Sequence, residues 1–64
     1  MKIPAYYAAN AERLTRFAAV HVADLRAAIA RNEAAGRETV AAHYRRSLQA
    51  WRDVLGNPAA FVQS

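Results

Sequence analysis

The positions of the glycines constrain the fold of this chain more than any other feature of its sequence. Neither the stretch between Pro4 and Gly36 nor the one between Gly36 and Gly56 contains glycine or proline. Alanine, the strongest helix former, supplies 17 of the 64 residues, and few residues favour strands. The sequence therefore predicts an all-α antiparallel hairpin, with a long first helix and a shorter second helix joined at Gly36.

The first helix is expected over about 5–34, and Asn10 makes two starting positions compatible with the sequence. It is either one continuous run, or a short piece followed by a helix that begins near 11 with Asn10 as its N-cap. At 100° per residue, one face collects apolar side chains and one histidine: Leu14, Phe17, Ala18, His21, Val22, Leu25, Ala28 and Ile29.

The second helix is expected over about 37–55, where Gly56 and Pro58 end it. Its apolar stripe consists of Val40, Tyr44, Ser47, Leu48, Trp51 and Leu55. Asn57 and Pro58 are also a helix start signal, so a short tail helix is expected over about 58–63.

The shortness of the chain predicts a single helical domain, 1–64, that associates with further copies. A domain of this size buries only about 60% of the surface that its unfolded chain exposes, and small folds compensate with disulfides, metals or oligomerisation. The sequence contains no cysteine, which excludes disulfides and thiolate metal sites. We therefore expect a homo-oligomer, in the first place a dimer, that forms a helical bundle.

Pairing the helices outward from Gly36 predicts that the first helix extends past the second. His21 comes to lie near Trp51, and the end of the second helix reaches only to about Phe17. About a dozen residues, 18–20 Å of helix, then overhang, and the apolar residues on this overhang without a partner in the hairpin are Ile3, Tyr6, Tyr7 and Leu14. If Phe61 and Val62 of the tail fold back, they cover part of it, and the remainder is exposed. An exposed apolar surface of this kind usually marks an interaction site. The predicted partner-binding residues are Tyr6, Tyr7, Asn10, Arg13, Leu14 and Phe61.

The side chains needed for catalysis or metal binding are sparse. In the predicted register, His21 and His43 lie about 12 Å apart along the hairpin, so one ion cannot bind both, and His21 is expected to stack on Trp51. The sequence has no glycine-rich phosphate loop, and no serine or threonine lies in a nucleophile motif. We therefore expect neither an enzyme nor a bound metal or cofactor.

The net charge of +4 favours acidic partners. Eight of the nine basic residues are arginine, a side chain suited to phosphate. An alternative function is therefore binding of nucleic acid or a phosphate-bearing nucleotide. The residues predicted for this role are Arg13, Arg16, Arg45, Arg46 and Arg52.

The length and the predicted hairpin resemble the Rop family of plasmid RNA-binding proteins, which are dimers of helical hairpins forming four-helix bundles. Asn10 matches the first RNA-contacting position of that family, but Leu14, Ala18 and Leu25 stand where the family has an aromatic residue, Gln and Lys. The resemblance implies a dimeric bundle and no transfer of RNA binding.

The first hypothesis is a small non-enzymatic protein that acts by stoichiometric protein–protein interaction, as an inhibitor, adaptor or regulator. Its partner is expected to offer an acidic or apolar groove. The size suits a factor encoded by a phage or plasmid. The sequence shows no membrane-spanning run and no signal peptide, so a cytoplasmic location is expected.

Overall fold

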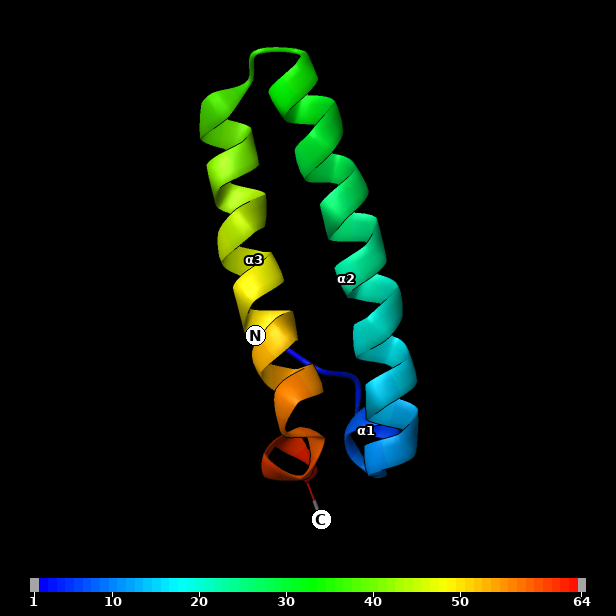
Figure 1. Cartoon of the computed structure of the whole chain (residues 1–64). Helices are drawn as coiled ribbons and strands as arrows, with labels where there is room; N and C mark the ends of the chain where they lie inside the picture. Colours follow the sequence, from blue (N-terminus) through cyan, green and yellow to red (C-terminus); the bar gives the residue numbers. More distant parts are fainter. Residues whose placement is uncertain (1, 64) are drawn as a thin grey trace.

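Two long antiparallel helices form most of the computed structural model, which describes residues 2–63 (Figure 1). The elements are α1 (Ala5–Ala8), α2 (Ala11–Ala34), α3 (Glu38–Gly56) and the 3-10 helix η1 (Pro58–Phe61). No strand occurs in the described residues, and the molecule measures 42 × 18 × 15 Å. The predicted all-α hairpin is confirmed.

The first helix is interrupted at Asn10, which confirms the second of the two predicted alternatives. The backbone of Asn10 is extended, with φ −150° and ψ 128°, and its side-chain oxygen accepts a hydrogen bond of 3.1 Å from the Arg13 amide. This is the usual N-cap arrangement, since it satisfies an amide that has no partner within the helix. The break lets α1 turn and pack against the start of α2.

The turn between α2 and α3 depends on Gly36, whose φ of +73° lies in the left-handed region. The Arg37 amide then donates a 2.8 Å hydrogen bond to the Asn32 carbonyl, which closes the end of α2. From this turn α3 runs through Gly56, and η1 ends at Phe61, two residues before the predicted end of the tail helix.

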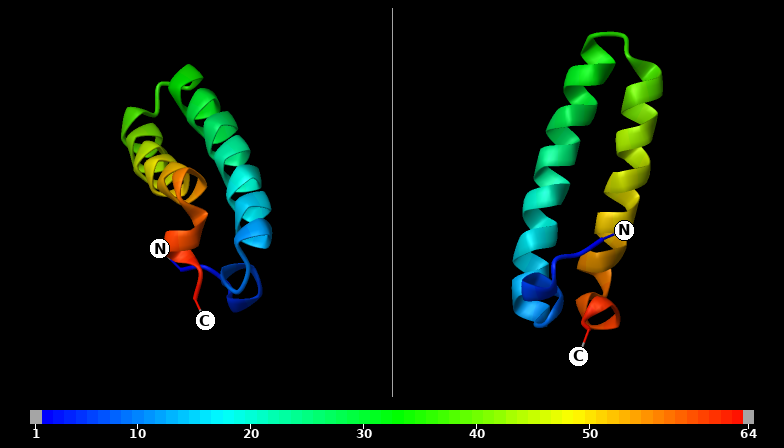
Figure 2. Two further views of the ribbon diagram at one scale, coloured as in Figure 1. Left: turned by 60° about the horizontal axis from the view of Figure 1, so that its bottom comes forward. Right: turned by 180° about the vertical axis from the view of Figure 1, so that it is seen from behind.

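The core lies at the end of the hairpin away from Gly36, which we call the base. Its buried residues are Leu14, Ala18, Val22, Trp51 and Val54, and partly buried side chains surround them: Ile3, Phe17, Leu25, Leu48, Leu55, Phe61 and Val62. The segment before α1 crosses α3 near the base, and η1 closes the end (Figure 2).

The apolar stripe predicted for α3 needs one correction near each end. Val40 is 41% exposed instead of buried as predicted, whereas the small side chains of Ala28 and Ala41 are buried in the same half of the hairpin. Val54 was absent from the stripe and is fully buried. Segments outside the two long helices also cover the base, so a wider arc of α3 is buried there.

The predicted overhang is wrong. Leu14 is fully buried, Ile3 and Tyr7 are half-buried, and Tyr6 alone of the four apolar residues assigned to it is exposed. The interruption at Asn10 shortens the first long helix, which therefore does not extend past α3 as predicted. The tail covers the apolar side chains that remain at the base. The Gln63 amide donates a 2.8 Å hydrogen bond to the carbonyl of Ala8, which joins the tail to α1.

Candidate functional site

A row of aromatic rings runs from the core to the surface at the base. The Phe17 ring packs edge-to-face on Trp51, with centroids 5.4 Å apart, and stacks on Tyr7 at 4.1 Å. Tyr7 in turn meets Tyr6 edge-to-face at 5.1 Å. His21 stacks on Trp51 at 4.4 Å, as predicted. Since offset and edge-to-face pairs are the favoured geometries, this row fixes the rings of α1 on the core.

Tyr6 ends this row, with 61% of its surface exposed. The Arg13 guanidinium lies 4.3 Å from the centroid of the Tyr6 ring, a cation–π contact. Tyr6 and Arg13 thus form one exposed patch, which we call the tyrosine patch. Among the other predicted partner-binding residues, the Asn10 side chain caps α2, while Tyr7 and Phe61 are half-buried and Leu14 is buried.

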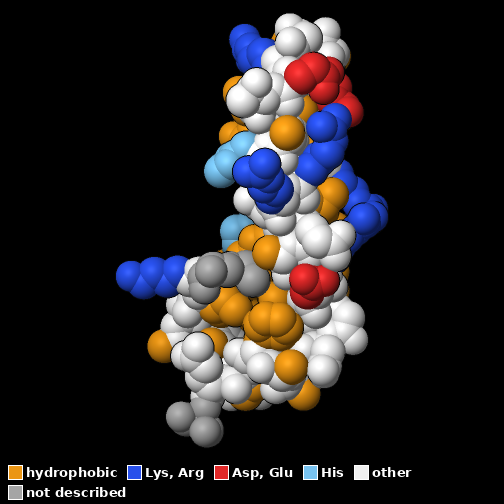
Figure 3. Space-filling view, turned by 90° about the vertical axis from the view of Figure 1, so that its left-hand side faces the viewer, with side chains coloured by type: hydrophobic (Ala, Val, Ile, Leu, Met, Phe, Trp, Pro, Cys, Tyr) orange, Lys and Arg blue, Asp and Glu red, His pale blue; other side chains and the backbone are white. Residues whose placement is uncertain are grey.

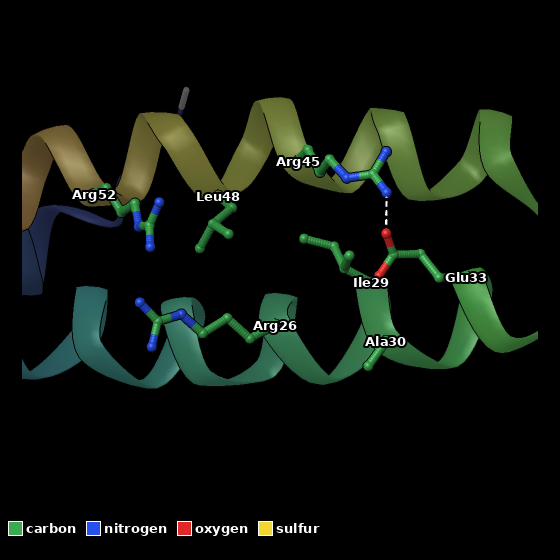
Figure 4. Close-up of a pocket in the computed structure, with 7 residues that line it drawn as sticks. All are labelled: Arg26, Ile29, Ala30, Glu33, Arg45, Leu48 and Arg52. Carbon is green, nitrogen blue, oxygen red and sulfur yellow. Dashed lines mark hydrogen bonds and ion pairs between the residues drawn. The ribbon is translucent and has the colours of Figure 1, made fainter.

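A groove of about 480 Å³ lies between α2 and α3 in the half of the hairpin nearer Gly36 (Figure 4). Its apolar floor comprises Ile29 and Leu48. The remaining lining residues are Arg26, Ala30, Glu33, Arg45 and Arg52. We call this surface the arginine groove.

Charge is distributed unevenly along the arginine groove. Toward Gly36, Arg45 forms an ion pair with Glu33 and lies 3.9 Å from a carboxylate oxygen of Glu38. Toward the base, Arg26 and Arg52 point toward each other from the two helices (Figure 4). Neither forms an ion pair within residues 2–63. Among the lining residues, the end toward Gly36 therefore holds one balanced ion pair, and the other end carries a surplus of two positive charges.

The five arginines predicted to bind phosphate do not share one surface. Only Arg45 and Arg52 line the groove. Arg13 lies against Tyr6, and Arg16 is paired with Glu12 at 2.7 Å, whereas Arg46 lies outside the groove. Basic side chains nevertheless gather over the half of α3 toward the turn, while hydrophobic ones gather at the base (Figure 3).

Of the charged residues in the groove, Arg26 and Glu33 were not among the predicted site residues, and Arg26 is the one without an ion pair in the described residues. Its side chain is exposed and lies at the edge of the contact between the two long helices. The sequence feature that indicates this groove is a pair of seven-residue spacings between charged residues. One spacing runs from 26 to 33 in the first helix, and the other runs from 45 to 52 in the second. Each spacing flanks an apolar residue, Ile29 or Leu48.

The described residues contain no group of three or more His, Asp or Glu side chains that could hold a metal ion. Within the same range, no helix is long and apolar enough to cross a membrane.

No family model, curated protein or solved structure matches this chain. The tyrosine patch and the arginine groove must therefore be interpreted from their own chemistry.

Proposed function

We propose that this chain is a small non-enzymatic binding protein, an inhibitor, adaptor or regulator that acts by stoichiometric contact with another protein. The observation that carries the proposal is the tyrosine patch. A large aromatic ring is 61% exposed and is held by Tyr7 on one side and by Arg13 on the other. Tyrosine and arginine are among the residue types that dominate the energetics of protein interfaces.

The fixed position of the Tyr6 ring favours binding because little conformational entropy remains to be lost. Its neighbour Tyr7 stacks on Phe17, and Phe17 packs on the buried Trp51, so the patch rests on the core. A side chain that is already ordered avoids about 0.5–1.5 kcal/mol of ordering cost on binding. The matching partner has an apolar groove for the ring and a carboxylate at its edge for Arg13.

We further propose that the chain forms a homodimer. Two helices alone provide a thin core, and in the half nearer Gly36 neither α1 nor η1 covers the hairpin (Figure 1). Association with a second copy would bury additional apolar surface in that half. The tyrosine patch lies at the opposite end and stays accessible in such a dimer.

The test is affinity capture from a lysate of the source cells, with nuclease added, followed by purification of the captured protein. We expect Tyr6→Ala to lose the captured protein and Val20→Ala, at an equally exposed position, to retain it. Both variants keep their helicity in circular dichroism, because neither side chain is part of the core. Retention of the captured protein by Tyr6→Ala would contradict the proposal.

A second candidate function, binding of nucleic acid or a phosphate-bearing nucleotide, is supported by the unpaired Arg26 and Arg52. Two guanidinium groups that point toward each other suit an anion bound between them. This alternative predicts a steep salt dependence, with a log–log slope of about −0.9 per duplex phosphate neutralised. For nucleic acid it also predicts that nuclease removes the captured material, which separates this alternative from the first proposal.

A further inference from the structure

We propose that the arginine groove binds a short amphipathic helix of a partner protein, with an acidic side chain between Arg26 and Arg52 and an aliphatic side chain over the apolar floor. This inference rests on the proposed function of binding another protein. It goes beyond the tyrosine patch, because it assigns a second contact surface and the kind of segment that fits it. The observation behind it is the order of charged and apolar side chains along the groove.

The end of the groove toward the base favours an anion. Arg26 and Arg52 point toward each other from α2 and α3 (Figure 4). Both side chains are exposed, and within the described part of the chain neither has an acidic partner. The two guanidinium groups repel each other, and a carboxylate between them replaces this repulsion with two charge-assisted contacts. This end therefore suits an acidic side chain of the bound segment.

The rest of the groove requires no further negative charge. Its floor is formed by Ile29 and Leu48, which are aliphatic. Toward Gly36, Arg45 is already paired with Glu33. The complementary segment is therefore acidic at one end, aliphatic at its centre, and neutral or basic at the other end.

The spacing of these features matches a helix. In each long helix, the two charged lining residues are seven positions apart, which is two helical turns or about 10 Å. Ile29 follows Arg26 by three positions, and Leu48 precedes Arg52 by four. An amphipathic helix in a groove makes its contacts through residues three, four and seven positions apart. The predicted segment therefore has Asp or Glu three or four positions from Leu or Ile.

Two other occupants fit the groove less well. A nucleic acid strand is negative along its whole length, so it meets Glu33 at the end toward the turn, and none of the described lining residues is aromatic and able to stack on a base. A second copy of this chain brings three further arginines and one further glutamate to the same surface, and contacts between like charges are unfavourable. A homodimer therefore forms outside the groove.

Synthetic helical peptides test the inference directly. The probe is a fluorescein-labelled peptide rich in alanine and glutamine, with glutamate, leucine and lysine at relative positions 0, 4 and 7 on one face. It is prepared in this order and in the reverse order. The control peptide has the same composition, with the leucine moved to the opposite face of the helix. Fluorescence anisotropy measures binding to the full chain. We expect one order of the probe to bind at least about tenfold more tightly than the control.

Charge reversal in the groove tests the position of the acidic side chain. We expect Arg26→Glu and Arg52→Glu each to weaken probe binding at least about tenfold. Arg46→Glu makes the same change of charge outside the groove and is expected to bind like the wild type. All three side chains are exposed, and circular dichroism confirms that each variant is folded. An equal loss in all three variants would indicate attraction by net charge alone and would overturn the groove as the site.

A bulky side chain locates the site without a change of charge. Ala30 lines the groove and is exposed, so Ala30→Trp is expected to obstruct the bound helix and weaken probe binding at least about tenfold. Ala27 is exposed on α2 outside the groove, and Ala27→Trp is expected to retain binding. Equal affinities of these two variants for the probe would contradict the inference.

Two further measurements separate this inference from the other proposals. A single-stranded thymidine oligonucleotide that binds more tightly than the probe, with the same loss in Arg26→Glu and Arg52→Glu, would overturn the peptide in favour of nucleic acid. Tyr6→Ala is expected to leave probe binding unchanged, because Tyr6 does not line the groove. A wild-type chain that binds neither order of the probe better than the control would overturn the inference and leave the tyrosine patch untouched.

Discussion

The imidazole of His21 stacks on the indole of Trp51, with ring centroids 4.4 Å apart and planes inclined by 24°. This contact joins the two long helices within the core. Phe17 packs edge-to-face on both rings, so three residues from two helices form one unit. The aromatic row that holds Tyr6 at the surface starts from this unit, which makes the proposed binding patch dependent on the core.

Removal of the indole is expected to destabilise the fold severely. Trp51 is 9% exposed, and Trp→Ala at a buried site costs about 3–5 kcal/mol. That loss is comparable with the free energy of unfolding of a whole domain of this size, about 3–10 kcal/mol. Thermal denaturation followed by circular dichroism should show a broad unfolding transition for Trp51→Ala, at a lower temperature than that of the wild type. Val20→Ala, at a position that is 60% exposed, should stay within about 0.5 kcal/mol of the wild type.

The N-cap of α2 provides a second test. Asn10→Ala removes the acceptor of the Arg13 amide and is expected to lower the free energy of unfolding by about 1 kcal/mol. Asn10→Ser keeps an acceptor oxygen and should retain most of that stability. Urea denaturation of both variants measures the difference, and equal midpoints for Asn10→Ala and the wild type would show that the cap contributes nothing.

The two glycines are expected to respond in opposite directions. Gly36 has a φ of +73°, so Gly36→Ala is strained by about 1 kcal/mol even though the space around it is open. The φ of Gly56 is not positive, and no atom lies within 4 Å of an added Cβ. Gly56→Ala should therefore be neutral or stabilise by about 0.4–1 kcal/mol. Melting temperatures that fall equally for both would contradict the described turn.

The tail contributes to stability through Phe61, which packs on the core from η1. Because the side chain is half-buried, we expect Phe61→Ala to cost about 1–2 kcal/mol, less than the loss of a fully buried phenylalanine. The amides of Ala8 and Gln63 should also exchange with solvent faster in this variant, since their segments lose a shared support. Hydrogen exchange measured by NMR follows both of these amides. Unchanged exchange at Ala8 would mean that the tail does not hold α1.

Local signals in the sequence predicted much of this fold. Gly36 marked the turn, and counting outward from it placed His21 beside Trp51. These features depend on helix periodicity and on residues close in sequence. Asn10 was recognised as a cap candidate, but two helix starts remained open. Only the packing of α1 against α2 decides between them.

What the sequence did not predict depends on contacts between distant segments. The burial of Leu14 requires α1 to fold back and the tail to close the base, held by the bond between Gln63 and Ala8. Periodicity along one helix carries no information about such a closure. Arg26 was missed for a similar reason, because its position opposite Arg52 follows only when the register of both helices is known.

The affinity of the purified captured protein for the wild type and for Tyr6→Ala tests the central claim most directly. Isothermal titration calorimetry gives both the dissociation constant and the stoichiometry. We expect one partner per chain and a loss of at least about thirtyfold for Tyr6→Ala, the size of an interface hot spot. An affinity that the substitution leaves unchanged would contradict the assignment of the tyrosine patch as the binding surface.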